Sequence, residues 1–424
     1  MMYIALALFA VTYVLMLVFS KYRPYIALAS GLIFVVSGML PITSVLGEID
    51  FNVILMIAGT MGIVSLFIES KMPALLADII MEKVPNVQWA AVAMALFAGI
   101  ISAFVDNVAT VLMVAPVALA ICKKLGTNPV PFIIAIAVSS NLQGAATLVG
   151  DTTAIMLGSA LDMSFIDFFW YQGRPGMFFA VELGAGLSAI ILYFLFRREK
   201  AAIPKESART RVTDFVPTIL LVGTIVLLIV ASFIPNKPEI TNGLICCGLL
   251  VIGLVYNLIR KKKLSAITTP LKEIDFQTIG LLLGLFIMIG GIKEQGVIDA
   301  AAGLLAKMGG GNVFLLYTVI VWASVLISAF IDNIPYVATM IPVIAGLASA
   351  LNVDPTVLYF GLLSGATLGG NCTPIGASAN ITGIGILRKE GYTVKNSDFF
   401  KIGIPFTLAA IIPAYVYLWL MYGI

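Results

Sequence analysis

The stretch "ISAFVDNVATVLMVAP" at residues 101–116 returns as "ISAFIDNIPYVATMIP" at residues 327–342. Both copies place an Asp-Asn pair inside a run of apolar residues. At a constant offset of 226 positions, 16 of the 55 residues from 101 to 155 are identical to their partners. The identities include Asp, Asn, Pro and Gly. An apolar composition alone would produce chance identities of residues such as Leu and Val, but not of these. The chain therefore contains two copies of one unit.

Composition places both copies in a membrane. The 424 residues are 60% hydrophobic and 11% charged, with a mean hydropathy of +1.06, which is typical of an integral membrane protein. We expect the first apolar segment to be a retained helix, because no basic residue precedes it and it shows no cleavage site. Segments of about 20 apolar residues can cross a bilayer. They lie at 2–20, 24–42, 51–69, 129–161, 174–196, 214–235, 240–259, 277–296, 355–387 and 402–423. The predicted fold class is an all-α polytopic membrane protein with about 10–11 spanning segments.

Charge predicts the orientation of these segments. With the basic loops 197–211 and 260–263 in the cytoplasm, only four of the 25 Lys and Arg residues face outside. They are Arg174, Lys237, Lys293 and Lys307. The N-terminus then lies outside under the positive-inside rule, in what we expect to be a prokaryotic plasma membrane. The first unit starts outside and the second starts inside, so the two are inverted repeats, a feature of many secondary transporters.

Between the spanning segments lie two double segments, residues 88–122 and 313–350. Each limb of about 16 residues reaches about 25 Å at 1.5 Å per residue, short of a core of about 30 Å. We therefore predict two re-entrant hairpins with Asp-Asn at the tips. The predicted domains are N-terminal scaffold helices (1–48), repeat 1 (49–196), a cytoplasmic linker with scaffold helices (197–273) and repeat 2 (274–424). We also expect residues 70–85 and 297–308 to form short amphipathic helices.

The hairpin tips are the first candidate site. Asp106 and Asn107 begin the second limb of one hairpin, and Asp332 and Asn333 begin that of the other. One interpretation is that these residues only cap helices. The alternative is ion binding, because intramembrane carboxylates are costly and usually functional. Both roles can coexist, and a sodium ion is a candidate ligand of these four side chains.

The second candidate site lies in the segments that follow the hairpins. They read "SSNLQGAATLVGDTTAIMLG" (139–158) and "SGATLGGNCTPIGASANITG" (364–383). Such polar runs predict helices broken at mid-depth, whose free carbonyls suit a cation and whose free amides suit an anion. The alternative is that small residues allow close helix packing. The candidate residues are Thr147, Gly150, Asp151, Thr152 and Thr153 in the first break, and Thr373, Pro374, Gly376, Ser378 and Asn380 in the second.

With "SAFVDN", "SAFIDNIP" and "LGGNCTPIGASAN", the chain resembles the ion transporter superfamily. It resembles specifically the branch of arsenite permeases, NhaD-type antiporters and the melanosomal P protein, and its motifs look most like those of the P-protein side. This branch is related to divalent anion:sodium symporters. The resemblance implies two inverted halves, each with a scaffold part and a transport part. It further implies ion sites between hairpin tips and breaks, in a homodimer that works by an elevator movement. The dicarboxylate-transporting relatives carry Ser-Asn-Thr at the tip, so Asp106 and Asp332 depart from them and favour proton exchange.

Asp151 adds a third carboxylate near Asp106. It belongs to "GDTTAI" (150–155), where P-protein-like sequences tend to have prolines and an Asn. Carboxylates that share a site hinder one another's ionisation, which suits a group that trades a proton for a cation.

Several function classes are disfavoured by what the sequence lacks. No histidine is present, which removes zinc-protease and His-assisted hydrolase chemistry, so we expect no enzyme. No phosphate-binding G-x-x-x-x-G-K-[ST] motif is present, and any ATP coupling requires a separate ATPase subunit. The four cysteines form no C-x-x-C motif, and nothing indicates nucleic-acid binding.

We therefore predict a secondary active transporter of a small ion, coupled to a proton or sodium gradient, with an antiporter preferred. The alternatives are a sodium-coupled anion or dicarboxylate symporter and an uncoupled anion channel. Arsenite or antimonite, sodium, chloride and carboxylates all remain candidate substrates. Apart from protons or sodium no cofactor is expected, and the predicted partners are the ion, membrane lipid and a second copy of the chain.

Overall fold

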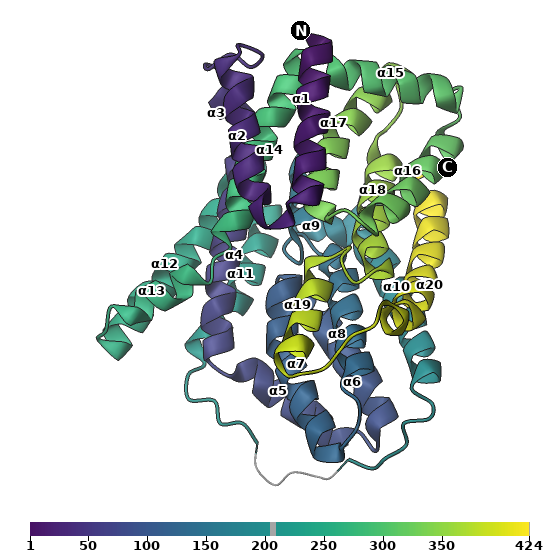
Figure 1. The fold of residues 1–424 in the computed structure, drawn as a ribbon. Coiled ribbons are helices and arrows are strands. Elements are labelled where there is room, and N and C mark those ends of the chain that lie inside the picture. The colour runs from purple at the N-terminus through teal and green to yellow at the C-terminus, as the bar shows by residue number, and fades with distance from the viewer. Residues whose placement is uncertain (204–208, 424) are drawn as a thin grey trace.

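The structure, a computed structural model, describes residues 1–203 and 209–423. Figure 1 shows an assembly of helices. The first half contains α1 (Met2–Val18), α2 (Arg23–Val36), α3 (Val45–Glu48), α4 (Phe51–Glu69), α5 (Met72–Lys83), α6 (Val87–Ser102), α7 (Asn107–Leu125), α8 (Val130–Gln143), α9 (Thr152–Ala160) and α10 (Met177–Leu195). The second half contains α11 (Val216–Ser232), α12 (Thr241–Lys261), α13 (Ser265–Lys272), α14 (Phe276–Glu294), α15 (Val297–Gly309), α16 (Val313–Ser328), α17 (Asn333–Leu351), α18 (Thr356–Gly369), α19 (Ser378–Lys389) and α20 (Asn396–Tyr422). Short elements are η1 (Ser20–Tyr22), η2 (Gly144–Ala146), η3 (Ile166–Phe168), η4 (Gly370–Cys372) and the paired strands β1 (Trp170–Tyr171) and β2 (Arg174–Pro175).

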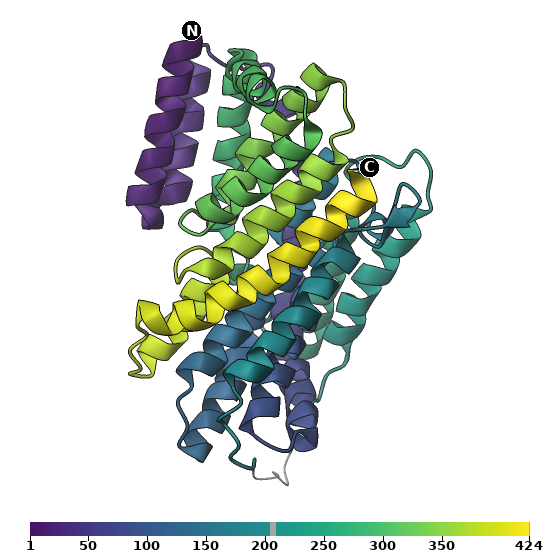
Figure 2. The ribbon, with the colours of Figure 1, turned by 90° about the vertical axis from the view of Figure 1, so that its right-hand side faces the viewer.

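The two halves repeat helix by helix. Helices α14 to α19 begin 225 or 226 positions after α4 to α9. The correspondence extends to the preceding helices, because α2 packs along α14 just as α12 packs along α4. Figure 2 shows α1 and α2 side by side at one edge of the molecule, with α20 running obliquely across it. The predicted division of each half into scaffold and transport parts stays a prediction.

The hairpins enter from opposite ends of the molecule. In Figure 1, α6 and α7 lie in the lower half and α16 and α17 in the upper half. Asn86 and Asn312 cap the first limbs, since each side chain accepts a hydrogen bond at 3.1 Å from a backbone amide in the first turn of its helix. Helix α6 has 16 residues and is about 24 Å long, too short to span a bilayer. The second limbs, α7 and α17, have 19 residues each, more than the 16 or so predicted, and are themselves long and apolar enough to cross a membrane. The inverted, re-entrant arrangement of the two halves matches the expected fold class.

The predicted broken helices form the centre of the molecule. The first consists of α8, η2 and α9, and the second of α18, η4 and α19. All 14 residues of α18 are buried, and so is nearly every residue of α8. A helix that is apolar on all sides belongs inside a protein, which explains why these two show no amphipathic pattern.

Seven helices in the described ranges are long and apolar enough to cross a membrane. They are α4, α7, α10, α12, α14, α17 and α20. Helices α15 and α16 make an eighth span if that pair, bent by 117°, is counted as one. Three of the other predicted crossings are shorter helices: α1, α2 and α11 have 17, 14 and 17 residues. The predicted crossings at 129–161 and 355–387 are the two broken helices. Helices α5 and α15 occupy the ranges predicted for short amphipathic helices.

Candidate functional site

Asp106 and Asp332 sit at the hairpin tips and cap the helices that follow. Asp106 accepts hydrogen bonds from two backbone amides of α7 at 3.0 and 3.2 Å, and Asp332 accepts one from α17 at 3.2 Å. Capping uses one oxygen of each carboxylate. The other oxygen of Asp332 accepts from the Ser378 hydroxyl and from Arg23 Nη1, both at 3.2 Å. The capping interpretation therefore describes only part of what these side chains do.

The hairpin tips are tied to the helix breaks in the same way in both halves. The Thr147 hydroxyl donates a hydrogen bond to the carbonyl of Ala103, and Thr373 donates to the carbonyl of Ala329. Both donors and both acceptors are 226 positions apart. Each threonine thus holds a tip against a break.

Gly150 and Gly376 make this close approach possible. A Cβ atom added to Gly150 would lie 2.5 Å from the carbonyl oxygen of Gly144 and 2.8 Å from that of Ser102. At Gly376 the corresponding distances are 2.6 and 2.8 Å. Carbonyl oxygens from the ends of two helices therefore converge on each glycine, as expected for an environment that favours positive charge.

A buried amide network joins the two halves. Asn141 Nδ2 donates to the Thr367 carbonyl at 2.7 Å and to Asn371 Oδ1 at 3.1 Å. Asn371 Nδ2 donates to the Val138 carbonyl at 2.9 Å, and Asn107 Nδ2 donates to Asn141 Oδ1 at 3.0 Å. Thr367 is the repeat counterpart of Asn141, so the halves meet at equivalent positions.

Asp151 is a central carboxylate without a repeat counterpart, since Ala377 takes the equivalent position. It is 4% exposed. Its Oδ2 accepts from the Thr153 hydroxyl at 2.9 Å and from Asn333 Nδ2 at 3.2 Å. Thr153 is also 3.2 Å from the Thr367 hydroxyl of the second half. Asp151 therefore links the first break to the second hairpin tip.

Six of the predicted residues line one cavity of about 410 Å³. They are Asp106, Asn107, Asp151, Thr152, Asn333 and Ser378. We call this space the inner cavity. Three further carboxylates, Glu69, Glu273 and Asp275, also line it, and its described lining contains no Lys or Arg.

The charges of the inner cavity favour cations. The first residues of α7, α9, α17 and α19 all line it, and each helix N-terminus contributes roughly +0.5 of an elementary charge. Together these amount to about +2, less than the charge of the five lining carboxylates when they are ionised. One of them, Glu69, is paired with Lys261. The remaining balance still attracts protons or metal cations more than free anions.

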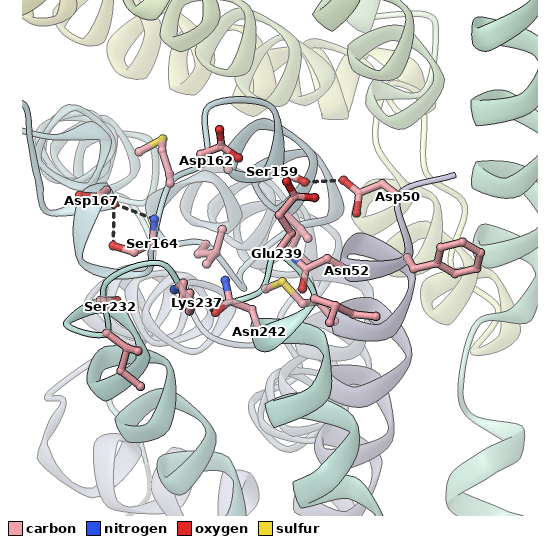
Figure 3. Close-up of a pocket in the computed structure, with 18 of the residues that line it drawn as sticks. Asp50, Asn52, Ser159, Asp162, Ser164, Asp167, Ser232, Lys237, Glu239 and Asn242 are labelled. Atoms are coloured by element: carbon pink, nitrogen blue, oxygen red, sulfur yellow. Dashed lines mark hydrogen bonds between the residues drawn. The ribbon is translucent and has the colours of Figure 1, made fainter. Parts of the chain in front are cut away.

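A second cavity, of about 870 Å³, lies beside the opposite end of α4 and is shown in Figure 3. We call it the outer cavity. Asp50 caps α4 there and accepts a hydrogen bond from Ser159 of α9. Asp162, Asp167 and Lys237 line the same space. Asp50 belongs to the "IDF" triplet that recurs with Asp275, so the two cavities carry equivalent acidic residues.

The remaining predicted residues support the breaks. Besides the two threonines and two glycines already placed, Asn380 Nδ2 donates to the carbonyls of Gly370 and Thr373, both at 3.0 Å. Asn380 Oδ1 is buried and finds no hydrogen-bond partner among the described residues. Pro374 is half-buried in the turn at the second break. Neither Asn380 nor Pro374 lines the inner cavity.

No cluster of three or more His, Cys, Asp or Glu side chains that could hold a metal ion occurs in the described ranges. A sodium ion at the tips would therefore need carbonyl, hydroxyl and amide oxygens beside single carboxylates, the ligands that hard cations accept. The predicted sodium site stays a prediction.

Sequence reasoning missed Arg23, Asn141 and Asn371. Asn141 stands inside the quoted polar run, but nothing in the sequence alone pairs it with the second half. Arg23 was counted with the charges of an inner loop, whereas its side chain is 18% exposed and ion-paired with Asp332. A signal existed, because Arg23-Pro24 at the start of α2 recurs as Lys237-Pro238 shortly before α12.

Comparisons with known proteins agree with this architecture. The 46 kDa membrane protein of Mycobacterium leprae is 33% identical over 330 residues, covering 76% of this chain and 74% of that protein. An uncharacterized transporter of Mycobacterium tuberculosis is 33% identical over 325 residues, with the same coverage. The P protein of Sus scrofa is 25% identical over 460 residues, covering 89% of this chain and 54% of its own length.

A solved structure shares the fold. The YdaH transporter of Alcanivorax borkumensis superimposes with a TM-score of 0.62 at 14% identity, covering 90% of this chain and 88% of that one. The sequence model described as "Citrate transporter" (CitMHS) matches residues 13–365 and 248–423. These matches bear out the expected ion transporter superfamily and a multi-pass membrane transporter rather than an enzyme. The chain belongs to the CitMHS family of transporters.

Proposed function

We propose that the chain exchanges a small cation for protons through the carboxylates at its centre. The observation that supports this most is the position of Asp151. Its carboxylate meets the second hairpin tip through Asn333 and shares the inner cavity with Asp106. A proton and a metal cation can compete for such a group, whereas a passive channel needs no group that alternates protonation.

A sodium ion or a proton is the proposed coupling ion. Half-helix carbonyl ends converge at both breaks, and half-helix carbonyls coordinate coupling ions in transporters with broken helices. The acidic lining of the inner cavity would also concentrate cations at its entrance. These features favour the binding of a cation at the inner cavity.

Citrate is the second candidate substrate, because the family model bears that name. Four helix N-termini open into the inner cavity, and such termini bind carboxylates. Free citrate would meet several like charges there. We therefore propose that citrate, if transported, enters together with a cation or as a protonated species.

The proposed movement is an elevator-like shift of hairpins and broken helices against the scaffold, in a homodimer. Two cavities at opposite ends of α4 support alternating access from two sides. Under the positive-inside rule the inner cavity would face the cytoplasm. The dimer follows from the family resemblance, and chemical cross-linking in native membranes tests it.

Solid-supported membrane electrophysiology on proteoliposomes tests the proposal. Steps of sodium, pH, citrate, citrate with a divalent cation, arsenite and chloride would be applied in turn, with empty liposomes as control. Currents that appear on cation or pH steps and need an opposing gradient would support exchange. Currents carried by chloride alone, without any dependence on sodium or proton gradients, would contradict it.

A further inference from the structure

The scaffold helices carry a repeated basic residue. Helix α11 begins 214 positions after α1, and at the same offset Arg23-Pro24-x-Ile26 at the start of α2 matches Lys237-Pro238-x-Ile240 before α12. Helix α1 packs on α2 and α14, and α11 packs on α12 and α4. Arg23 and Lys237 are therefore structural counterparts.

Arg23 binds the second hairpin tip. Its Nη1 lies 3.2 Å from Asp332 Oδ2, and the two side chains are 18% and 11% exposed. A hydrogen bond from its Nε to the Met16 carbonyl at 3.1 Å orients the guanidinium. Nearby, the Tyr13 hydroxyl donates to the Pro335 carbonyl at 2.6 Å. The corner between α1 and α2 is thus fastened to the start of α17.

Lys237 does not take the equivalent place. It lines the outer cavity with Asp162 and Asp167, and its Nζ lies 3.5 Å from Asn242 Oδ1. The partner expected for Lys237 is Asp106, because Asp106 is the repeat counterpart of Asp332. Asp106 lines the inner cavity instead. One basic residue of the repeated pair reaches its hairpin carboxylate, and the other does not.

The helix packing also differs between the two halves. Helix α9 packs against α4, where Ser159 donates to Asp50. Helix α17 packs against α14 more extensively than α7 packs against α4. The counterpart of Asp50, Asp275, accepts from Thr278 of its own helix at 2.7 Å and lines the inner cavity. The hairpins and broken helices are therefore displaced along a scaffold that is itself symmetric.

We propose that Arg23 and Lys237 are tethered counter-cations that bind the hairpin carboxylates in alternation. In the arrangement described, Arg23 neutralises Asp332 and leaves Asp106 open to the inner cavity. When the transport helices shift to the mirror arrangement, Arg23 leaves Asp332 and Lys237 binds Asp106. This inference rests on the proposed elevator movement and names the residues that determine which carboxylate is free.

The physical reason is the cost of an unpaired intramembrane carboxylate. Each end state stabilises one carboxylate with a fixed cation, and intermediate positions stabilise neither. The carboxylate left over in each state is the one that can take a proton or a transported cation. A ligand bound there competes with the tethered cation of the opposite state, which couples binding to the direction of movement.

Cysteine cross-linking tests the positions. In a variant without the four native cysteines, the pairs Arg23→Cys with Asp332→Cys and Lys237→Cys with Asp106→Cys would be oxidised in proteoliposomes. We expect both pairs to cross-link, each in a different fraction of the molecules. The inference would be overturned if the Arg23/Asp332 cysteine pair cross-linked completely and the Lys237/Asp106 pair did not cross-link under any ion or pH gradient.

Single substitutions test the charges while the hairpins stay intact. Spin labels at Leu32→Cys on α2 and Leu326→Cys on α16, both exposed, would report the distance between scaffold and hairpin. We expect Arg23→Gln to shift the ratio of the two states by roughly five- to tenfold in one direction and Lys237→Gln in the other. Arg23→Lys should restore much of the original ratio. Lys293→Gln is the matched control, since its partner Glu48 is also in the scaffold.

Shifts in the same direction, or none beyond the control, would contradict the inference. The readout does not depend on transport. Two populated distances in a protein that moves no ion would contradict the proposed function and leave the alternation standing. Ion-coupled flux in a protein that shows only one spin-label distance and only one cross-linked pair would contradict the alternation and leave the proposed function standing.

Discussion

Asn333 Nδ2 donates a hydrogen bond to the Asp151 carboxylate at 3.2 Å, joining residues 182 positions apart. The bond connects the tip of the second hairpin to the break of the first broken helix. A change of charge on Asp151 therefore acts on both halves at once. This makes Asp151 the residue through which the repeats can act together, although it has no acidic counterpart in the second repeat.

Asp151→Asn removes the charge and keeps the shape of this side chain. We expect gradient-driven flux to fall by at least about tenfold, equivalent to about 1.4 kcal/mol, because the group can no longer bind and release a proton. Thermal stability in detergent should change little, since the amide can still accept from Asn333. Flux at the wild-type level would show that coupling does not pass through Asp151.

Gly150→Ala and Gly376→Ala should each destabilise the fold by about 1–3 kcal/mol. An added methyl group would meet carbonyl oxygens at 2.5 to 2.9 Å at either position, and backbone cannot move aside cheaply. Thermal unfolding followed by tryptophan fluorescence measures the effect. Gly248→Ala in α12 is the control, because nothing lies within 4 Å of its added Cβ. Equal melting temperatures for all three variants would contradict the close contact between the hairpin tips and the helix breaks at these two glycines.

Asn141→Ala removes a buried amide that holds the halves together. The loss leaves partners on Asn371 and Asn107 unpaired, and each unsatisfied buried group costs about 1–3 kcal/mol. Thr224→Val is the control, since the Thr224 hydroxyl is buried but donates only to Leu220 of its own helix. Denaturation in detergent should separate the two variants clearly. If both variants unfold at the same denaturant concentration, the amide network contributes little to the stability of the contact between the two halves.

The sequence predicted the positions that the repeat marks. Asp106 and Asp332 were expected at hairpin tips because a costly polar pair recurred inside apolar runs, and both stand at the turns between limbs. The breaks were expected where Gly, Thr and Pro interrupt otherwise apolar segments. These are local signals, and local signals persist whatever the helices pack against.

Other features depend on packing and could not be predicted in this way. The contact of Asn141 with Thr367 follows from α8 and α18 lying together at the centre, which no local pattern specifies. Arg23 was interpreted as one of the basic residues that mark the cytoplasmic side, because a basic residue between apolar segments usually lies in a loop. Its pairing with Asp332 requires knowledge of how far the second hairpin reaches.

The central claim is that the hairpin carboxylates couple ion movement to a gradient. The most direct test compares wild type, Asp106→Asn, Asp332→Asn and the double variant in one electrophysiological assay on proteoliposomes, under opposed sodium and proton gradients. We predict that the gradient-dependent current is weakened in each single variant and absent from the double variant. Currents that persist in the double variant and ignore the gradients would contradict the account and leave the two Asp-Asn pairs as helix caps.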